Sequence, residues 1–414
     1  MVVSASHHER LRAEHVPGPA IALQPSQVDR RSLLKGIGAA GVTILVGGSG
    51  AVSYRAYDNG VLDAGSGIPY EGWKHWRSDA GPLGTVAAAI LAANPHNTQP
   101  WRFHVTETSV DLFSDQNRQL PHLDALAREH HIGLGCALEN LVLAGNVRGL
   151  GPTVTLLPTA GDPTHVAHVA FSASAGTPSR LYEAIGDRHS NRGPYTSTPV
   201  SASTLDELAA QAQGLPGLAV RWFTSSAEKS ALRTFLIDAT LAIIGDGAQS
   251  REAFAWFRNN RDDIDKHRDG LTLDGQGLNS LTLTLAKLLP ASSREAGDQF
   301  WLNQTRNVHT ATAAAYGVIV TADPTDVADR LAGGRLLQRI HLAATAHGLG
   351  LQHMNQITER IDREHSQGLP ATFEPRFDEL IAEPGQQALA TFRLGHPQRD
   401  ARRSPRRSLA AVTR

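Results

Sequence analysis

The order of hydrophobic and polar positions along the chain predicts a mixture of helices and strands. Apolar residues at helical spacing, together with N-capping residues, predict helices over residues 82–93, 123–147, 179–186, 201–213, 227–244 and 327–347. Short alternating or uniformly apolar runs predict strands over residues 101–106, 109–114, 154–157, 166–171, 218–224, 316–321, 349–354 and 388–394. Because strands and long helices do not alternate strictly, we expect an α+β fold with mixed β-sheets flanked by helices.

One stretch of this pattern occurs twice. The segment 137–151 aligns with 336–350, with the leucines, a Leu-Ala pair and a closing Gly-Leu-Gly in register. In each copy a glycine ends a predicted helix and a predicted strand follows. We therefore expect two tandem copies of one fold, over residues 73–175 and 176–414, with an insertion over residues 250–300 in the second copy.

The first 54 residues have a different pattern. Residues 1–29 are polar and rich in His, Pro and Glu, and we expect them to be disordered. The run Arg30–Lys35 (RRSLLK) follows, and residues 36–54 then carry no charged side chain. This order is typical of a twin-arginine export signal, so residues 30–54 are predicted to engage the twin-arginine translocation machinery. The chain would be exported or membrane-associated; a glycine-rich buried helix in a cytoplasmic chain is the alternative.

Composition narrows the chemistry. Hydrophobic residues make up 41% and charged residues 19% of the chain, as in globular proteins, and the net charge of −1 gives no reason to expect nucleic acid as a partner. The single cysteine, Cys136, excludes an internal disulfide and a cysteine metal cage. The histidine pairs 7–8 and 130–131 lack the i, i+4 spacing of helical metal ligands, so no metal site is expected. Any redox chemistry must therefore come from a bound cofactor.

Three polar segments carry candidate chemistry. In the first, two prolines bracket a loop over residues 94–103 that offers Asn97 and Gln99 as hydrogen-bonding groups to a flat heterocycle, or forms an ordinary turn. In the second, Arg188 and Arg192 flank a hydroxyl and could bind a phosphate monoester, or form a solvated basic turn. The third is the basic run 402–407, which follows a predicted core strand; such runs are usually solvated.

Together these segments resemble the nitroreductases. The Asn-x-Gln-Pro-Trp loop and the Arg-His-Ser-x-Arg segment are similar to the two FMN-contacting motifs of that family, and the closing Arg-Leu-Gly-His-Pro before the basic run resembles its last strand and phosphate-binding arginine. The chain is more specifically similar to the actinobacterial Acg type, in which two nitroreductase-like halves are fused. The resemblance covers residues 73–409 and implies a nitroreductase-like tandem pseudo-dimer. Each motif occurs once, so we expect a monomer with one flavin site.

The resemblance also assigns residues to the parts of FMN. The phosphate and ribityl chain would contact Arg188, His189, Ser190 and Arg192. The isoalloxazine ring would contact Asn94, Pro95, Asn97 and Gln99, with the stretch containing Gly350 and His353 close by. One or more C-terminal arginines would close on the phosphate, among them Arg402, Arg403, Arg406 and Arg407.

The chemistry implied by the resemblance belongs to the flavin. N5 would carry the hydride, no side chain would be a nucleophile, and His353 or Arg192 could place positive charge near N1 and C2=O. The implied activity is hydride transfer from NAD(P)H through FMN to a small-molecule acceptor, a nitro compound or a quinone. The alternative is an Acg-type protein that sequesters flavin under a lid formed by residues 250–300, with little or no turnover. A structural protein without flavin is a third alternative.

Overall fold

The computed structural model describes residues 59–61 and 64–414. The predicted disordered segment 1–29 and the predicted twin-arginine segment 30–54 lie outside the described residues. Within the described part, no helix is both long enough and apolar enough to cross a bilayer.

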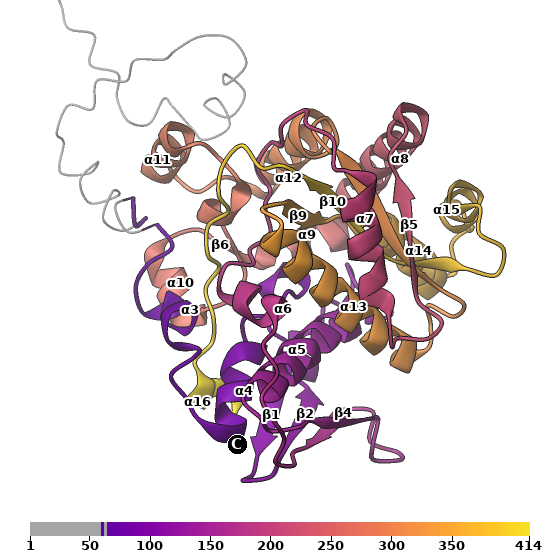
Figure 1. Cartoon of the computed structure of the whole chain (residues 1–414). Helices are drawn as coiled ribbons and strands as arrows, with labels where there is room; N and C mark the ends of the chain where they lie inside the picture. Colours follow the sequence, from indigo (N-terminus) through magenta and orange to yellow (C-terminus); the bar gives the residue numbers. More distant parts are fainter. Residues whose placement is uncertain (1–58, 62–63) are drawn as a thin grey trace, which may run out of the picture.

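Two four-stranded sheets organise the fold (Figure 1). The first has the order β1-β2-β4-β3 and consists of β1 (Trp101–Val105), β2 (Ser109–Ser114), β3 (Thr153–Leu156) and β4 (His165–Ala170). The second has the order β5-β8-β10-β9 and consists of β5 (Ala219–Phe223), β8 (Ala315–Thr321), β9 (Gly350–His353) and β10 (Gln387–Gly395). The strands β1, β2, β3 and β4 of the first sheet correspond in chain order to β5, β8, β9 and β10 of the second. With this correspondence the two sheets have the same strand order.

Each sheet also has a long helix at the same place in its order of strands along the chain. The helix α5 (Arg128–Val147) connects β2 to β3, and α13 (Val327–Ala346) connects β8 to β9, the equivalent strands. The chain is therefore an α+β tandem pseudo-dimer, as the repeat predicted. The predicted boundary at residue 175 falls between β4 and α6 (Arg180–Glu183).

The expectation of mixed sheets is wrong. Every strand pair in both four-stranded sheets is antiparallel, and the only parallel pair in the described part joins the two-residue strands β6 (Phe257–Arg258) and β7 (Leu271–Thr272). Apolar runs reveal where strands lie, but strand direction depends on the path of the connections, which the runs do not contain.

The halves differ in what connects their first two strands. Residues 106–108 join β1 to β2, whereas residues 224–314 join β5 to β8, so the insertion is longer than the predicted 250–300. Its helices are α8 (Ser226–Gly245), α9 (Gly247–Ala255), α10 (Arg261–His267), η6 (Leu273–Gln276), α11 (Ser280–Leu288), α12 (Arg294–Gln304) and the π-helical turn η7 (Thr305–His309).

The remaining helices surround the two sheets. In the first half and the connection they are η1 (Ile68–Tyr70), α3 (Gly72–His75), α4 (Gly81–Ala89), η2 (Pro95–Asn97), η3 (Gln116–Arg118) and η4 (Ala184–Gly186). In the second half they are α7 (Ala202–Ala209), η5 (Ala210–Ala212), α14 (Gln356–Gln367), α15 (Glu374–Ile381) and α16 (Leu409–Val412). The helix predicted over 123–147 begins only at Arg128, because the Asp124 carboxylate accepts hydrogen bonds from the backbone of Glu129 and His130 and caps it there.

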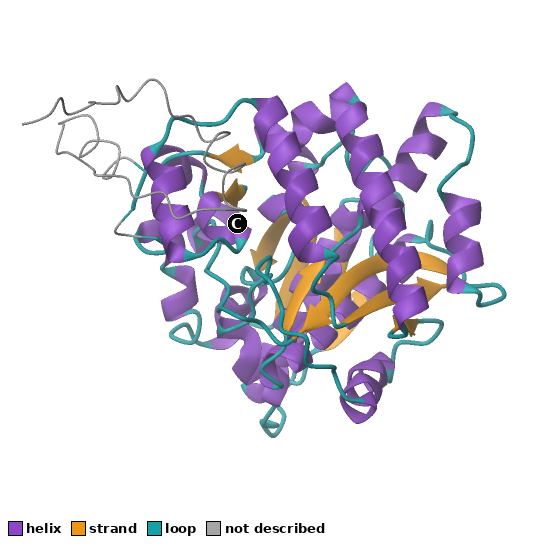
Figure 2. Cartoon of the chain, turned by 90° about the horizontal axis from the view of Figure 1, so that it is seen from above, coloured by secondary structure: helices purple, strands orange, loops and turns teal. Residues whose placement is uncertain are grey.

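The main hydrophobic core spans both halves, and α5 and α13 pack closely at its centre (Figure 1). Helices surround the strands in the view of Figure 2. A Cβ added to Gly135 would lie 2.1 Å from the carbonyl oxygen of Leu331, and one added to Gly334 would lie 2.1 Å from that of Ile132. In the register of the repeat, Gly135 aligns with Gly334 and Ile132 with Leu331. The contact is therefore reciprocal, as in a two-fold interface.

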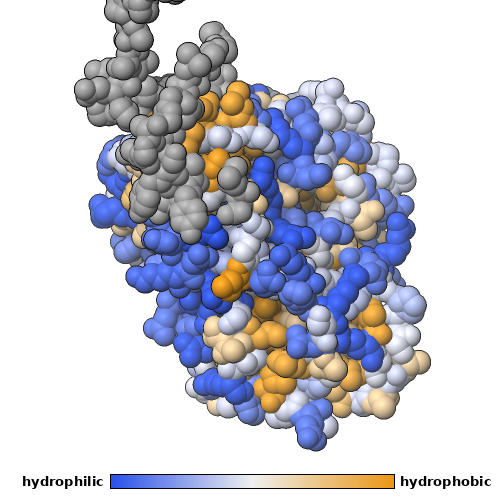
Figure 3. All heavy atoms as spheres, turned by 90° about the vertical axis from the view of Figure 1, so that its left-hand side faces the viewer, coloured by the Kyte–Doolittle hydropathy of each residue, from blue (hydrophilic) through white to orange (hydrophobic). Residues whose placement is uncertain are grey.

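The C-terminal segment returns from the second sheet to the first half (Figure 1). The amide of Arg406 donates to the carbonyl of Pro69 at 2.7 Å, and the amide of Arg414 donates to the carbonyl of Phe103 in β1 at 3.0 Å. The basic run 402–407 is thus held against the protein. The face of the molecule in Figure 3 is mostly hydrophilic with separate hydrophobic patches, and the described chain exposes Ile68 and Leu281.

Candidate functional site

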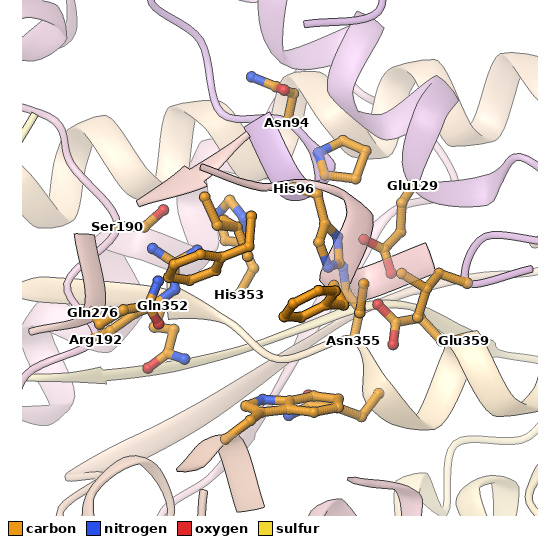
Figure 4. A pocket seen from close by; sticks show the side chains of 18 of the residues that line it. Asn94, His96, Glu129, Ser190, Arg192, Gln276, Gln352, His353, Asn355 and Glu359 are labelled. Carbon is orange, nitrogen blue, oxygen red and sulfur yellow. The ribbon is translucent and has the colours of Figure 1, made fainter. Parts of the chain in front are cut away.

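A cavity of about 260 Å³ lies where the two halves and the insertion meet (Figure 4). The first half contributes the loop before β1 and the start of α5, and the second contributes the 190–192 segment, β9 and α14. The insertion contributes most of the apolar wall, with Phe254, Phe257, Phe300 and Trp301. The volume approaches the lower end of the roughly 300–1,000 Å³ typical of small-molecule sites.

The proline-bracketed loop presents only part of its predicted residues to the cavity. Asn94 and Pro95 line it, together with His96, which the sequence analysis did not select. Asn97 and Gln99 do not line it. The side-chain amide of Asn97 donates to the carbonyl of Pro405 at 2.9 Å, and that of Gln99 donates to the carbonyl of Arg268 at 2.8 Å. These two amides therefore tie the loop to the C-terminal segment and to the insertion.

The predicted phosphate segment enters the cavity through two of its residues. Ser190 and Arg192 line it, and Ser190 forms a β-bridge with Leu351 in β9. Arg192 donates from Nη1 to the carbonyl of Gly275 in the insertion at 3.2 Å. Burial lowers the pKa of Arg192 to about 10, so it remains charged at neutral pH.

Arg393 in β10 holds this segment in place. Its side chain is fully buried, and it donates to the carbonyl of Gly193 at 2.7 Å and to that of Asn191 at 3.2 Å. Its Nε donates to the side-chain oxygen of Gln352 at 2.7 Å, and Gln352 lines the cavity. A lone charged residue in the apolar strand 387–395 was the available signal for this role.

Strand β9 presents His353 to the cavity but not Gly350. His353 lines the cavity, and burial lowers its pKa to about 3, with Arg188 and Arg192 adding to the effect. It is therefore neutral near pH 7, and the positive charge at this end belongs to Arg192. A Cβ at Gly350 would lie 2.9 Å from Cε1 of Tyr195, so the glycine allows close packing beneath the site.

Two further arginines form a buried cationic cluster beside the 190–192 segment. Arg188 and Arg406 both donate to the carbonyl of Leu91, at 2.9 and 3.4 Å, and both guanidinium groups lie over the ring of Trp73. His189 contacts Trp73 edge-on at 4.5 Å between ring centroids. Burial and then Arg188, Arg406 and Arg403 lower the pKa of His189 well below its usual value.

This cluster has no anionic partner among the described residues. The Nε atoms of Arg188 and Arg406 are buried without a hydrogen-bond acceptor. Burial lowers the pKa of Arg188 to about 10, and burial followed by the nearby Arg188 charge lowers that of Arg406. Adjacent unpaired cations are costly in a protein interior, and a bound anion with several oxygens would offset that cost.

The opposite end of the cavity is acidic. Glu129 on α5 and Glu359 on α14 both line it, and Figure 4 shows their carboxyl groups pointing toward each other beside His96 and Asn355. Burial raises the pKa of Glu129, and the nearby Glu359 and Asp124 raise it further. Burial also raises the pKa of Glu359, to about 8. No local motif in the sequence indicates this pair.

The repeat gives the α5–α13 pair a second side that is equivalent to the side facing the cavity. Ion pairs fill this second side. Glu139 on α5 contacts the Nε atoms of Arg335 and Arg339 on α13, each at 2.7 Å. Arg339 also donates to the carbonyls of Gln211 and Gln213, in the segment before β5. That segment is equivalent to the proline-bracketed loop before β1.

Comparison with known proteins gives relatives of one kind. No family model matches the chain. A protein of Mycobacterium tuberculosis H37Rv provisionally named an NAD(P)H nitroreductase is 30% identical over 181 residues, 43% of this chain and 52% of that protein. The acg protein of the same organism, also provisionally named an NAD(P)H nitroreductase, is 33% identical over 118 residues, 28% of this chain and 35% of that protein. The chain thus matches about half the length of the first relative.

Solved nitroreductases resemble the chain only weakly. The FMN-dependent nitroreductase NfnB of Mycobacterium smegmatis, in complex with NADPH, has 15% identity and a TM-score of 0.37, covering 57% of this chain and 97% of that one. The FMN and NADPH-dependent nitroreductase NfnB of a Sphingopyxis strain has 21% identity and a TM-score of 0.36, covering 56% and 96%. Scores this low support no conclusion about binding or catalysis.

Proposed function

We propose that this chain, which belongs to the Acg type of the nitroreductase superfamily, binds one FMN in the cavity between its halves and uses it as an NAD(P)H-dependent reductase. The observation that supports this most is the unpaired cationic cluster of Arg188 and Arg406. Neither arginine lines the cavity, but Arg188 comes two residues before Ser190, which does. The donor set fits a phosphate monoester attached to a flat polar ring.

The residues present fit FMN in two groups. Arg188 and Arg406, with Arg403 near them, would hold the phosphate, and Ser190 would contact the ribityl chain. Asn94, Pro95, Gln352 and His353 would contact the ring, with Arg192 as the positive charge beside it. Asn97 and Gln99 would act indirectly, because Asn97 accepts a hydrogen bond from Arg406 and Gln99 accepts one from the amide of Arg407. The flavin, when bound, would supply hydride transfer.

An arginine variant tests this site. Losing one charged hydrogen-bond partner typically costs about 1.5–3 kcal/mol, or one to two decades in affinity. Arg188→Ala and Arg406→Ala should each weaken FMN binding by about that factor and leave riboflavin, which has no phosphate, nearly unaffected. Arg180→Ala, near the same segment but outside the cluster, is the control. Equal losses for both ligands, or stoichiometry of two FMN per chain by native mass spectrometry, would contradict the site.

Flavin sequestration without turnover is the second candidate, and the insertion favours it. The segment 268–270 is fastened over the loop before β1: Asp269 forms ion pairs with Arg118 at 2.9 Å and with Arg258 at 2.7 Å, and the amide of Gly270 donates to the carbonyl of Asn97 at 3.2 Å. A cover held this way would restrict access of NAD(P)H.

The absorption spectrum of the yellow protein with and without NADPH separates the two candidates. Rapid bleaching supports reductase activity. If bleaching is slow in the wild type but fast in Asp269→Ala, the insertion is a lid and the protein retains its flavin. Bleaching that stays equally slow in both proteins, although dithionite reduces them quickly, would argue against the lid.

Export through residues 30–54 remains a proposal of its own. Replacing Arg30 and Arg31 by Lys should retain the chain in the cytoplasm. Cell fractionation that finds both forms in the cytoplasm would contradict it.

A further inference from the structure

The acidic end of the cavity is not part of the set of residues that we propose to hold FMN. Glu129 and Glu359 come from different halves of the pseudo-dimer, on α5 and α14, and converge on the same space. Neither forms an ion pair with a cation among residues 59–61 and 64–414, although Glu139, also on α5, has two. The pair is placed where a second ligand in the cavity would meet it.

The contact between the two carboxyl groups requires a proton. Oε1 of Glu129 is buried and finds no donor from any other group in the described structure, while the carboxyl of Glu359 faces it. Two carboxylate oxygens accept hydrogen bonds and cannot donate, so they face each other stably only when one carries a proton. Asn355 lines the cavity beside the pair and is held in place, because its side-chain oxygen accepts a hydrogen bond from the amide of Thr391 at 2.8 Å.

We propose that Glu359 is the general acid that protonates the electron acceptor, and that Glu129 positions it and stabilises its carboxylate. This rests on the proposed reductase function. A quinone becomes a hydroquinone by gaining a hydride, which the reduced cofactor supplies, and one proton. Glu129, whose pKa burial and the neighbouring Glu359 raise well above its usual value, keeps its own proton throughout. The O–H bond of Glu359 breaks, an O–H bond forms on the quinone oxygen, and Glu359 is left as a carboxylate that accepts a hydrogen bond from protonated Glu129.

The surroundings suit the donation of the proton. Burial raises the pKa of Glu359 to about 8, so it holds a proton at neutral pH and can still release one. The charged groups facing the pair are Asp124, Asp362 and Glu252, with Arg128 paired to Asp362. Glu252 on α9 of the insertion is half-buried, and its carboxylate accepts hydrogen bonds from the amides of His122 and Leu123.

Rapid mixing of the reduced holoprotein with a naphthoquinone tests the acid. In the wild type the rate should fall as pH rises through about 8. Glu359→Gln should lower the rate by about 100-fold or more, the usual contribution of a general acid, and remove this pH dependence. Glu129→Gln should keep most of the rate but move the inflection in pH. Glu364→Gln is the matched control, because Glu364 is a buried carboxylate on the same helix that accepts hydrogen bonds from Thr372 instead of facing the cavity.

An infrared measurement on the flavin-free protein keeps the two proposals separable. At neutral pH the wild type should show the carbonyl stretch of a protonated carboxylic acid that Glu359→Gln removes and Glu364→Gln retains. If FMN does not bind, the reductase proposal fails and the donor role fails with it, whatever the infrared band shows. If FMN binds and is reduced, but Glu359→Gln keeps the wild-type rate and pH profile, the acid role alone is overturned.

Discussion

The two sides of the α5–α13 pair occupy equivalent positions in the repeat, but they differ in charge and in how much of the space between the elements is filled. On one side Gly133 and Cys136 line a cavity whose glutamates, Glu129 and Glu359, have no cationic partner in the part of the chain that the structure describes. On the other side the aligned positions are Ala332 and Arg335, and Arg335 forms an ion pair with Glu139. At these two aligned positions, small residues line the cavity on one side, whereas an alanine and an arginine occupy the space on the other. We infer that this tandem chain has one ligand site because side chains occupy the equivalent position in the other half.

The largest expected effect is on the filled side. Glu139→Ala would remove the buried carboxylate that the half-buried Arg335 and Arg339 share. Removing one partner of a fully buried pair typically costs about 3–5 kcal/mol, and the partial exposure of these arginines reduces the expected cost to about 2–3 kcal/mol. Thermal or urea unfolding should show that loss, with FMN affinity per folded molecule unchanged. Cys136→Ala, one turn away on the same helix, should cost much less. If Glu139→Ala is as stable as the wild type, the ion pairs do not hold the halves together.

The unpaired glutamates should have a smaller effect, which is a dependence of the free energy of unfolding on pH. Glu359 has a usual pKa of 4.5 and one of about 8 in the fold, so the folded state binds more protons than the unfolded chain between these values. Stability is therefore fully present below about pH 4.5 and is lost as pH rises through about 8. We expect a loss of roughly 1–2 kcal/mol across this window, since part of the shift is relieved by solvent.

Glu359→Gln should flatten this pH profile, whereas Glu364→Gln should not. Unfolding free energies measured at several pH values give the slopes. A wild-type slope that Glu359→Gln leaves intact would place the titration on another group, such as Asp124, whose pKa is raised to about 6.

The same comparison shows what the sequence could reveal. The helix repeat and the basic segments were visible because each is a contiguous run, and the halves, Arg188 and Ser190 followed from them. The sequence does not predict which side chains of the loop before β1 face the cavity. His96, Asn97 and Gln99 all have positive φ, of 46, 55 and 52°, and the side chains of Asn97 and Gln99 bind the C-terminal segment and the insertion instead of lining the cavity. Nothing in the alternation of side chains predicts three such residues.

Residues that meet only through tertiary packing were also missed. Arg393 supports the 190–194 segment from a strand about 200 positions later, and Glu129 meets Glu359 across two halves. Neither belongs to a local pattern. Strand direction was lost for a similar reason, because it is set by connections such as the 224–314 insertion.

The smallest expected effect is at Gly133, where one methyl group distinguishes the two sides. A Cβ there would lie 3.0 Å from Cδ of Pro95 and 3.1 Å from Cβ of Asn94, closer than ordinary van der Waals contact, so the loop that lines the cavity must shift. Gly133→Ala should improve helix propensity by roughly 0.5–1 kcal/mol, which offsets most of the strain in unfolding experiments. FMN affinity should nevertheless fall by several-fold, since Asn94 and Pro95 would move relative to Ser190. Ala332→Gly is the matched change on the filled side: it should cost about as much helix stability and leave FMN affinity unchanged. If Gly133→Ala binds FMN as tightly as the wild type, the position of the loop does not determine affinity, and Asn94 and Pro95 are not contacts of the ring.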